Sequence, residues 1–396
     1  MKLLVFAHTP PPHHGQSYMV QLMLEGLRQG QEIECFHVNA RVSRDNEDIG
    51  GMRLGKMFLL LRYCAQAVWL RFRHGIKAFY YVPAPGKTSA VARDWVVMLL
   101  CRPFFPKLIL HWHAAGLSQW LESKGAMTRI LTHTLLGKSD LSILTSDMNR
   151  ADAESFGAKK IVAVRNCLPD PCPDFETNMR PRREARLAAR LKLQAGEKLS
   201  AQERAAAGGE PERVRVLFLA HCMREKGLFD TLDAVAQANA AWREQKAPWR
   251  MTLTVAGAFH SEEDRAEFER CTAAPEMKEM VQPLGFISGA QKQACLAESD
   301  VLCFPTYYHA EAQPLTVVES MAVGLPIVTT RWRSIPDILP PDYAGFVAPQ
   351  APAEVAQALR MAALANPFQA LRARFLECFT VERHLRDLTA ALRSVE

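Results

Sequence analysis

The hydrophobic pattern of this chain alternates between two periods from one end to the other. Short apolar runs, of the length typical of buried strands, alternate with longer segments in which apolar residues recur three and four positions apart, as on one face of a helix. A regular alternation of strand and helix is typical of parallel sheets covered by helices. The pattern therefore predicts an α/β protein.

Two sets of strands are expected. In the first half they cover residues 2–6, 33–38, 78–82, 107–112, 141–144 and 161–164, and in the second half residues 214–220, 250–256, 281–284, 301–304, 326–329 and 345–347. Each set is large enough to form one doubly wound parallel sheet. A chain of 396 residues also exceeds what one hydrophobic core usually organises, so two domains are expected.

The predicted boundaries follow from the strand sets and from one change in composition. Residues 1–172 form the first domain, residues 214–381 the second, and residues 382–396 a C-terminal helix. Residues 173–213 are interpreted as an interdomain insertion or linker, because they are rich in arginine, alanine and glutamate and poor in large apolar side chains other than leucine. This composition predicts an exposed helical excursion or a partly disordered segment.

Composition and charge exclude a few classes of protein. Hydrophobic residues make up 48% and charged residues 23%, as in an ordinary soluble globular protein. The net charge of +6 lacks the dense basic stripe of a nucleic-acid binder, so no nucleic-acid partner is expected. Arg62 and Arg102 interrupt the most apolar windows and prolines follow the first strand, so neither a transmembrane helix nor a signal peptide is expected. The ten scattered cysteines indicate buried free thiols in a reducing cytoplasm.

One segment of the second half carries the most informative polar residues. After the strand at 301–304, the sequence HAEAQPLTVVESMAVG predicts a loop, a helix with Pro314 at its first position, and a helix end at Val323 before Gly324. The helix is apolar almost all round, so Glu319 is not expected to be a solvated surface charge. Because an ionised carboxylate is costly to bury alone, a polar group is expected opposite it.

The start of this helix predicts an anion site. The free backbone N–H groups of Gln313–Thr316, to which Pro314 contributes none and Leu315 contributes one, form a positive helix end at the carboxyl edge of a parallel sheet, where phosphates commonly bind. Glu319, further along the helix, suits the vicinal hydroxyls of a ribose, and Glu311, ahead of the helix, suits other hydroxyls. Two hydroxyl acceptors on either side of a phosphate cradle describe a nucleotide-sugar site.

The same segment, EAQPLTVVESMAVGLPIV, resembles the donor-binding motif of the retaining glycosyltransferases of family four (glycosyl transferases group 1), which have the GT-B fold. FLAHCMREKGLFDTLDA, FAHTPPPHHGQS, VRNCLPD and LHWHAAG are similar to further segments of this family, so the resemblance covers most of the chain. It implies two Rossmann-like domains facing across a cleft, with the donor bound mainly by the second and the acceptor mainly by the first. It also implies a C-terminal helix that packs back on the first domain.

The resemblance implies roles for individual residues. Glu311 would hold the ring hydroxyls of the transferring sugar and support charge developing there, whereas Glu319 would bind the ribose. Lys226 would neutralise the donor diphosphate. The arginine that this family usually places in the same loop falls at His221, which has no permanent charge, and Arg224 is expected to substitute for it.

Further donor contacts are implied outside these two motifs. Gly15 and Gln16 stand where many relatives have two glycines, and Gly15 permits close approach of the backbone to the donor. His113 would act as a catalytic residue that faces the donor sugar from the first domain. Gly285 and Phe286 resemble the turn beneath the nucleotide base.

The implied reaction is a metal-independent hexosyl transfer with retention of configuration. The departing diphosphate oxygen takes the acceptor proton on the face of attack, so no side-chain nucleophile is needed and the protein supplies positioning and electrostatic stabilisation. No two aspartates stand two positions apart, so no Asp-x-Asp metal clamp and no cofactor besides the donor are expected. Lys226 and the positive start of the helix would neutralise the diphosphate in place of a divalent metal ion.

The expected acceptor is a carbohydrate or a lipid-linked saccharide of polysaccharide or glycolipid biosynthesis. Residues 53–75 carry arginines along a helix rich in Phe, Leu, Trp and Tyr. This stretch fits either peripheral contact with the inner face of the membrane or an ordinary core helix with its charged ends in water. The expected location is the cytoplasm.

Alternative functions stay open from the sequence. A nucleotide-sugar epimerase, a phosphorylase or a non-catalytic carbohydrate-binding relative would share the architecture. Residues 50–57 (GGMRLGKM) and 83–89 (PAPGKTS) approach the phosphate loop of a nucleotide hydrolase, but the first lacks Ser/Thr after its lysine and the second lacks the leading glycine. His111 and His113 lie on one strand face and would suit a metal ion, although no third ligand is nearby in the sequence.

Overall fold

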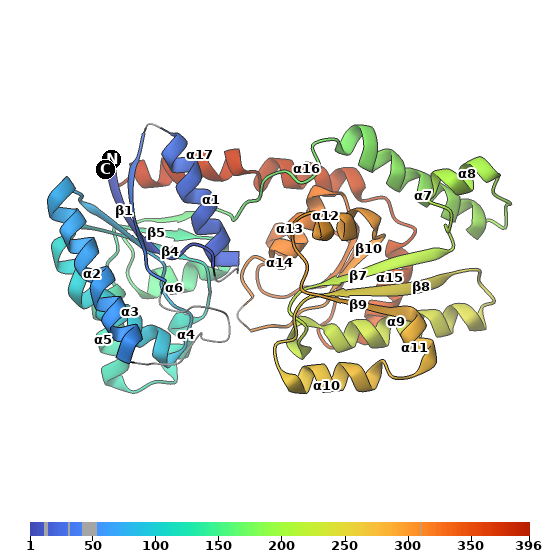
Figure 1. Cartoon of the computed structure of the whole chain (residues 1–396), viewed down its shortest axis with the longest axis horizontal. Helices are drawn as coiled ribbons and strands as arrows, with labels where there is room; N and C mark the ends of the chain where they lie inside the picture. The colour runs from blue at the N-terminus through green and yellow to red at the C-terminus, as the bar shows by residue number, and fades with distance from the viewer. Residues whose placement is uncertain (12–14, 31, 42–53, 310) are drawn as a thin grey trace. The chain divides into compact units, whose positions relative to one another are not determined.

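The computed structural model describes residues 1–11, 15–30, 32–41, 54–309 and 311–396. Contacts within the chain divide it into two compact units (Figure 1). Unit 1 contains residues 1–167, 311–313 and 378–396, and unit 2 contains residues 168–309 and 314–377. The segment 173–213, interpreted from the sequence as a linker, therefore lies within unit 2.

The centre of unit 1 is a parallel sheet with the strand order β2-β1-β3-β4-β5-β6. Most side chains of its central strands are buried, as is typical of a parallel sheet between two layers of helices. The strands are β1 (Lys2–Ala7), β2 (Glu34–Asn39), β3 (Ala78–Tyr81), β4 (Lys107–Trp112), β5 (Leu141–Leu144) and β6 (Ile161–Ala163).

Helices cover both faces of this sheet. On one face, α1 (Gly15–Gln29) and α17 (Val381–Arg393) share a core with the strands. The C-terminal helix α17 thus packs on unit 1, and Leu388 and Leu392 of its apolar stripe are fully buried. The helices that share the core on the other face are α2 (Leu54–His74), α3 (Thr88–Cys101), α4 (Leu117–Glu122), α5 (Ala126–Leu136) and α6 (Arg150–Ser155).

The centre of unit 2 is a second parallel sheet, with the order β12-β11-β10-β7-β8-β9. Its strands are β7 (Arg213–Leu219), β8 (Arg250–Ala256), β9 (Val281–Gly285), β10 (Val301–Phe304), β11 (Ile327–Thr330) and β12 (Phe346–Val347). All twelve strands expected from the hydrophobic pattern are therefore present, and their ends differ from the predicted ones by no more than one residue.

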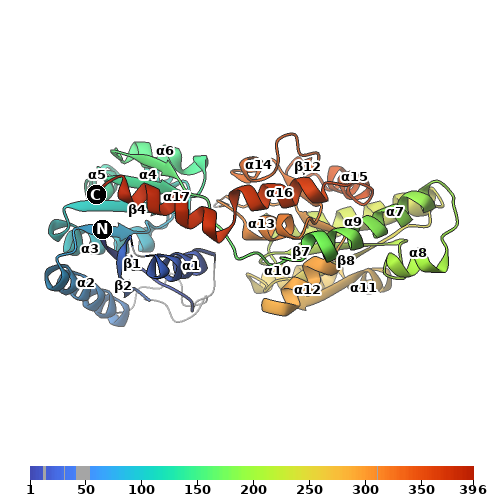
Figure 2. The same cartoon turned by 90° about the horizontal axis from the view of Figure 1, so that it is seen from above.

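The sheet of unit 2 also lies between two layers of helices. The helices α9 (Leu228–Glu244) and α15 (Pro352–Ala362) share the core on one face. Figure 2 shows α7 (Arg180–Gln194), α12 (Gly289–Glu298), α13 (Leu315–Ala322) and α16 (Phe368–Cys378) over the other face. The remaining helices of the unit are α8 (Ala201–Ala206), α10 (Glu262–Cys271), α11 (Pro275–Met280) and α14 (Ile335–Ile338).

Helix α7 corrects the expectation of an exposed or disordered segment. It is a regular helix in which Arg186 and Arg190 are buried. The buried carboxylate of Asp300 lies 2.6 Å from Arg190 and 3.4 Å from Arg186. Although burial alone would raise the pKa of Asp300, these two arginines hold it below its usual range. Arg186 and Arg190 can be buried because the carboxylate of Asp300 neutralises them. Asp300 lies in a distant part of the sequence.

Arg183, on the same helix, joins the C-terminal ends of two other helices. Its guanidinium donates to the carbonyl of Val323 at the end of α13, at 2.8 Å. It also donates to the carbonyls of Leu296 and Ser299 at the end of α12, both at 2.9 Å. The last carbonyls of a helix have no intrahelical partner, so a buried guanidinium satisfies them. Burial lowers the pKa of Arg183 to about 10, which leaves the side chain charged at neutral pH.

Replacing Arg183 by alanine is expected to lower the free energy of unfolding by about 3–5 kcal/mol, because three buried carbonyl groups lose their donor. Arg182→Ala is the matched control, since Arg182 bonds Glu298 at the surface and its loss should cost at most about 1 kcal/mol. Urea unfolding of both variants measures the difference. Equal losses would contradict the anchoring role of Arg183.

Candidate functional site

Helix α13 begins beyond the carboxyl end of β10, in unit 2. Pro314 is its N-cap and not its first helical residue as expected, because the ψ of 116° at Pro314 is extended. The helix therefore starts at Leu315, and the N–H groups of Leu315 and Thr316 lie at its positive end without intrahelical acceptors. The Thr316 hydroxyl is buried and has no hydrogen-bond partner within the described part of the chain. Hydrogen-bonding groups thus gather at a helix end suited to an anion.

Glu319 lies one turn further along α13. Its side chain is only 16% exposed, and its carboxylate contacts the ammonium group of Lys292 on α12. Burial raises the pKa of Glu319, and the charge of Lys292 opposes that shift. Lys292 is therefore the polar partner that was expected opposite Glu319. A carboxylate bonded to one lysine keeps other lone pairs that can accept from hydroxyl groups.

Lys226 lies in a short helical turn, η4 (Arg224–Lys226), after the carboxyl end of β7. Its ammonium group is 4.6 Å from the ring centroid of Tyr308 and 5.6 Å from that of Phe304. The carbonyl of Glu225 accepts from the N–H of Tyr307 at 2.8 Å, which ties this turn to the loop before α13. The turn thus holds a lysine beside aromatic rings at the same edge of the sheet as the start of α13.

Gly227 explains why this turn can lie so close to the loop after β10. Its φ of 81° is left-handed, and a Cβ atom there would be 2.5 Å from the carbonyl oxygen of Pro305. Only glycine fits without displacing backbone. In the sequence REKG, the glycine therefore allows the turn to approach the loop after β10, and this approach sets the position of Lys226.

His221 and Arg224 are the two residues expected near the position of the family's usual arginine. Arg224 forms an ion pair with Glu267 of α10 and stacks over the ring of Phe229 at 4.6 Å. The expectation that Arg224 substitutes for the missing arginine stays a prediction, and in that role its guanidinium would have to share its charge with Glu267. Desolvation and the charge of Lys226 lower the pKa of His221, so its imidazole is neutral at pH 7.

The side chain of Gln313 bonds the backbone of Asn166. Its side-chain oxygen accepts from the N–H of Asn166 at 2.9 Å, and its side-chain nitrogen donates to the carbonyl of Asn166 at 3.1 Å. Both residues are buried in unit 1. The Gln313 side chain thus holds the segment after β6 in place, and only its backbone is left for the predicted role. Glu311, two residues earlier, is also buried.

The candidate residues of unit 1 lie at the carboxyl edge of its sheet. Gly15 and Gln16 begin α1, and His113 directly follows β4. The rings of His113 and His111 are 4.1 Å apart, and His111 is hydrogen-bonded to the hydroxyl of Tyr80. Burial, with the nearby His113 and His384, holds the pKa of His111 well below its usual value. His111 is therefore a neutral support for the half-buried His113.

Gly285 ends strand β9 at the carboxyl edge of the sheet in unit 2, and Phe286 follows it. Gly285 has a left-handed φ of 67°, and the Phe286 side chain is 67% exposed. An exposed aromatic ring at this edge is available for stacking on a planar group.

The sequence also suggested a metal site at His111 and His113 and a phosphate loop at residues 50–57 or 83–89. The structure adds no further support for either. Within the described ranges, no three His, Cys, Asp or Glu side chains are placed to hold a metal ion. Residues 83–87 do lie between β3 and α3, with Lys87 as the N-cap of α3, and residues 88 and 89 begin that helix. Residues 50–53 of the other phosphate-loop segment, together with His13 and His14, lie outside the described residues, whereas 54–57 begin α2.

The architecture is that of known two-unit α/β proteins. The chain is similar to HepE of Anabaena in complex with UDP-glucose, over 99% of both chains with a TM-score of 0.66 and 15% identity. It is also similar to the sucrose-phosphate synthase of Thermosynechococcus elongatus, over 100% of this chain and 99% of that one, with a TM-score of 0.68 and 16% identity. The chain therefore has the predicted GT-B fold.

The family assignment comes from the sequence of unit 2. Residues 200–377, which include Lys226 and Glu319, match the model of the family described as Glycosyl transferases group 1. The amylovoran biosynthesis glycosyltransferase AmsK of Erwinia amylovora is 24% identical over 150 residues, which are 37% of this chain and 35% of AmsK. The chain thus matches about a third of the length of this curated relative. The resemblance noted from the sequence is confirmed at the level of the family.

The sequence did not reveal Lys292 or the buried Thr316 hydroxyl as parts of this site. Lys292 is the one basic residue in GAQKQACLAE, the sequence of α12. A search for the cation required by Glu319 could have examined the helix preceding β10, because consecutive helices of a parallel sheet often lie side by side.

Proposed function

We propose that this protein transfers a sugar from a nucleotide diphosphate-sugar to a hydroxyl acceptor, with retention of configuration. The observation that carries the proposal is the arrangement at α13, where the N–H groups and the buried Thr316 hydroxyl meet at the helix start and Glu319 is held by Lys292 one turn on. Phosphate would bind at the helix start, and the ribose hydroxyls would donate to Glu319. The fold shared with HepE, whose structure contains UDP-glucose, supports this ligand class.

Each remaining residue has a distinct role in the proposed reaction. Lys226 neutralises the diphosphate as the glycosidic bond to it breaks, and Glu311 holds the sugar hydroxyls and stabilises the positive charge that develops on the ring. The backbone at Gly15 approaches the donor closely, and Phe286 stacks near the base. His113 faces the donor sugar. The acceptor hydroxyl attacks, and its proton goes to the departing phosphate oxygen.

We also propose that transfer needs no divalent metal and no cofactor. A metal ion in such enzymes neutralises the leaving diphosphate, and Lys226 with the start of α13 would supply positive charge in its place. The acceptor is proposed to be a saccharide of polysaccharide or glycolipid biosynthesis, since AmsK is named for the biosynthesis of amylovoran.

A donor screen tests this function. We expect one group among UDP-, GDP-, ADP- and dTDP-sugars to raise the thermal midpoint, because a ligand at about 100 times its Kd stabilises by about 2.7 kcal/mol. Glu319→Gln should weaken this donor about tenfold, and Glu279→Gln, on the exposed surface of α11, should not. Stabilisation by nucleoside triphosphates alone, or unchanged binding by Glu319→Gln, would contradict the proposal.

We further propose that unit 1 rests on the inner face of a membrane from the cytoplasm. Helix α2 contains no acidic residue, and it exposes Phe58, Trp69 and Phe72, which are 74%, 60% and 67% accessible. Arg62 and Arg73 are also exposed on this helix. An aromatic and basic surface suits an interface with anionic lipids. None of the helices within the described ranges has the length and apolar character needed to cross a bilayer.

Vesicle sedimentation measures this contact. Vesicles with anionic lipid should bind the protein more tightly than neutral vesicles, and the double substitution Trp69→Ser and Phe72→Ser should weaken binding at least tenfold, because two interfacial aromatic rings are lost. Leu376→Ser is the control, since Leu376 is an exposed apolar residue of α16. Equal binding of all three proteins would contradict a lipid contact through α2.

A further inference from the structure

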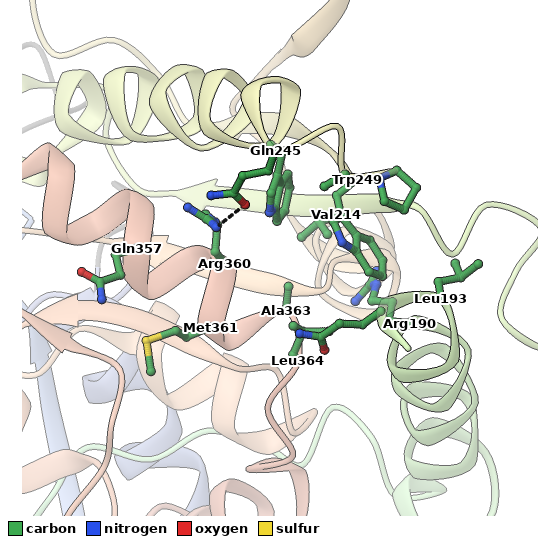
Figure 3. Close-up of a pocket in the computed structure, with 14 residues that line it drawn as sticks. Arg190, Leu193, Val214, Gln245, Trp249, Gln357, Arg360, Met361, Ala363 and Leu364 are labelled. Atoms are coloured by element: carbon green, nitrogen blue, oxygen red, sulfur yellow. Dashed lines mark hydrogen bonds between the residues drawn. The ribbon is translucent and has the colours of Figure 1, made fainter. Parts of the chain in front are cut away.

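A cavity of about 710 Å³ opens in unit 2 away from the candidate site (Figure 3). Val214, near the start of β7, and Trp249, just before β8, line it. Lys226 and the start of α13 instead follow the carboxyl ends of β7 and β10. The cavity and the candidate site therefore lie at opposite edges of the same sheet.

Two indole rings and several amide groups shape this cavity. The ring centroids of Trp242 and Trp249 are 6.3 Å apart and their planes are inclined by 42°. Trp242 is buried, whereas Trp249 is half-buried. Gln245 is the C-cap of α9, and Gln357 lies on α15. Their side chains bring amide donors and acceptors to the opening. A volume of this size is within the range of small-molecule sites.

The charge of the lining is entirely positive. It contains Arg190 and Arg360 and no aspartate or glutamate. Arg190 is already committed, because it pairs with Asp300 and donates to two backbone carbonyls. Arg360 donates to the neutral side-chain oxygen of Gln245 at 3.0 Å and lies 6.0 Å from the ring centroid of Trp242, and no carboxylate of the described residues forms a salt bridge with it. The guanidinium of Arg360 is thus available to an anionic ligand.

We propose that this cavity binds a saccharide unit that carries a carboxylate. The apolar C–H face of a pyranose ring packs on the indole of Trp249, its hydroxyls bond the glutamine side chains, and its carboxylate bonds the guanidinium of Arg360. A planar guanidinium matches a carboxylate with two parallel hydrogen bonds. The absence of acidic side chains from the lining means that no like charge opposes such a ligand. The site is distinct from the one proposed for transfer.

Calorimetric titration of the full chain with a matched pair of oligosaccharides tests this site. The probe is a tetrasaccharide that contains uronic acid, and its partner is the same compound with each carboxylate reduced to a hydroxymethyl group. We expect the acidic compound to bind about tenfold more tightly. Arg360→Gln should remove this tenfold preference, whereas Trp249→Ala should weaken both compounds.

The controls separate this site from the donor site and from general charge. Arg243→Gln removes a surface arginine that pairs with Glu276 on the same side of unit 2, and it should leave the preference unchanged. Saturating nucleotide-sugar should not displace the acidic tetrasaccharide, and transfer to a monosaccharide acceptor should be unaffected by Trp249→Ala. Equal affinity for both compounds, an unchanged preference in Arg360→Gln, or displacement by the nucleotide-sugar would overturn the proposal. These three overturning results come from binding alone, so they do not depend on whether transfer itself is observed.

Discussion

The substitution Glu311→Ala is expected to abolish sugar transfer, with a loss of at least about 10³-fold in kcat. Glu311 is buried, and we propose that its carboxylate stabilises the positive charge that develops on the sugar ring as the bond to the diphosphate breaks. A group that acts on the transition state lowers kcat when it is removed, while a group that only binds substrate raises KM. The rate of nucleoside diphosphate release in the presence of acceptor measures this effect.

The Glu311→Ala experiment needs proof that the protein is folded and that the donor still binds. The donor that stabilises the parent protein should still raise the thermal midpoint of Glu311→Ala. Glu279→Ala, which removes an exposed glutamate of α11, should keep full activity. Full turnover by Glu311→Ala with a verified donor would refute the catalytic role of this carboxylate.

Replacing Lys226 by methionine is expected to lower kcat/KM by about 10²–10³-fold. Methionine keeps an unbranched side chain beside Tyr308 and Phe304 but removes the positive charge. Because the charge of the diphosphate increases as it departs, most of the loss should appear in kcat. Initial rates over a range of donor concentrations separate the two constants.

Two further variants make the Lys226 result specific. Lys226→Arg should recover part of the activity, since it restores the charge with a different shape. Lys278→Met removes an exposed lysine of α11 and should have no effect. If Lys226→Met were as active as Lys278→Met, the leaving diphosphate would have to be neutralised by another group.

The fold could be predicted because each strand is marked by residues that are adjacent in the sequence. Each parallel strand is a short apolar run bounded by turn residues, and all twelve such runs are strands in the structure. The buried arginines of α7 could not be predicted, because an arginine-rich sequence normally indicates a solvated helix. Asp300 and the helix ends that Arg183 bonds are more than a hundred residues away in sequence.

From the residue pattern alone, the candidate site could be predicted only where the chemistry lies within one segment, and Lys226 was added by the resemblance to a family. Glu319 and the start of α13 stand close together in the sequence, and the apolar character of the helix indicates that Glu319 is enclosed. Lys292 is on another helix, and the side-chain bonds of Gln313 and Arg224 involve partners 147 and 43 positions away. Such pairings depend on tertiary packing, which no local spacing encodes.

A crystal structure of the protein with the nucleotide-sugar selected by the donor screen tests the central claim most directly. We predict that the diphosphate lies at the N–H groups of Leu315 and Thr316 and beside Lys226, with the ribose hydroxyls on Glu319. A nucleotide bound elsewhere while the start of α13 stays empty, or a Glu319 carboxylate that bonds only Lys292 in the complex, would contradict the account.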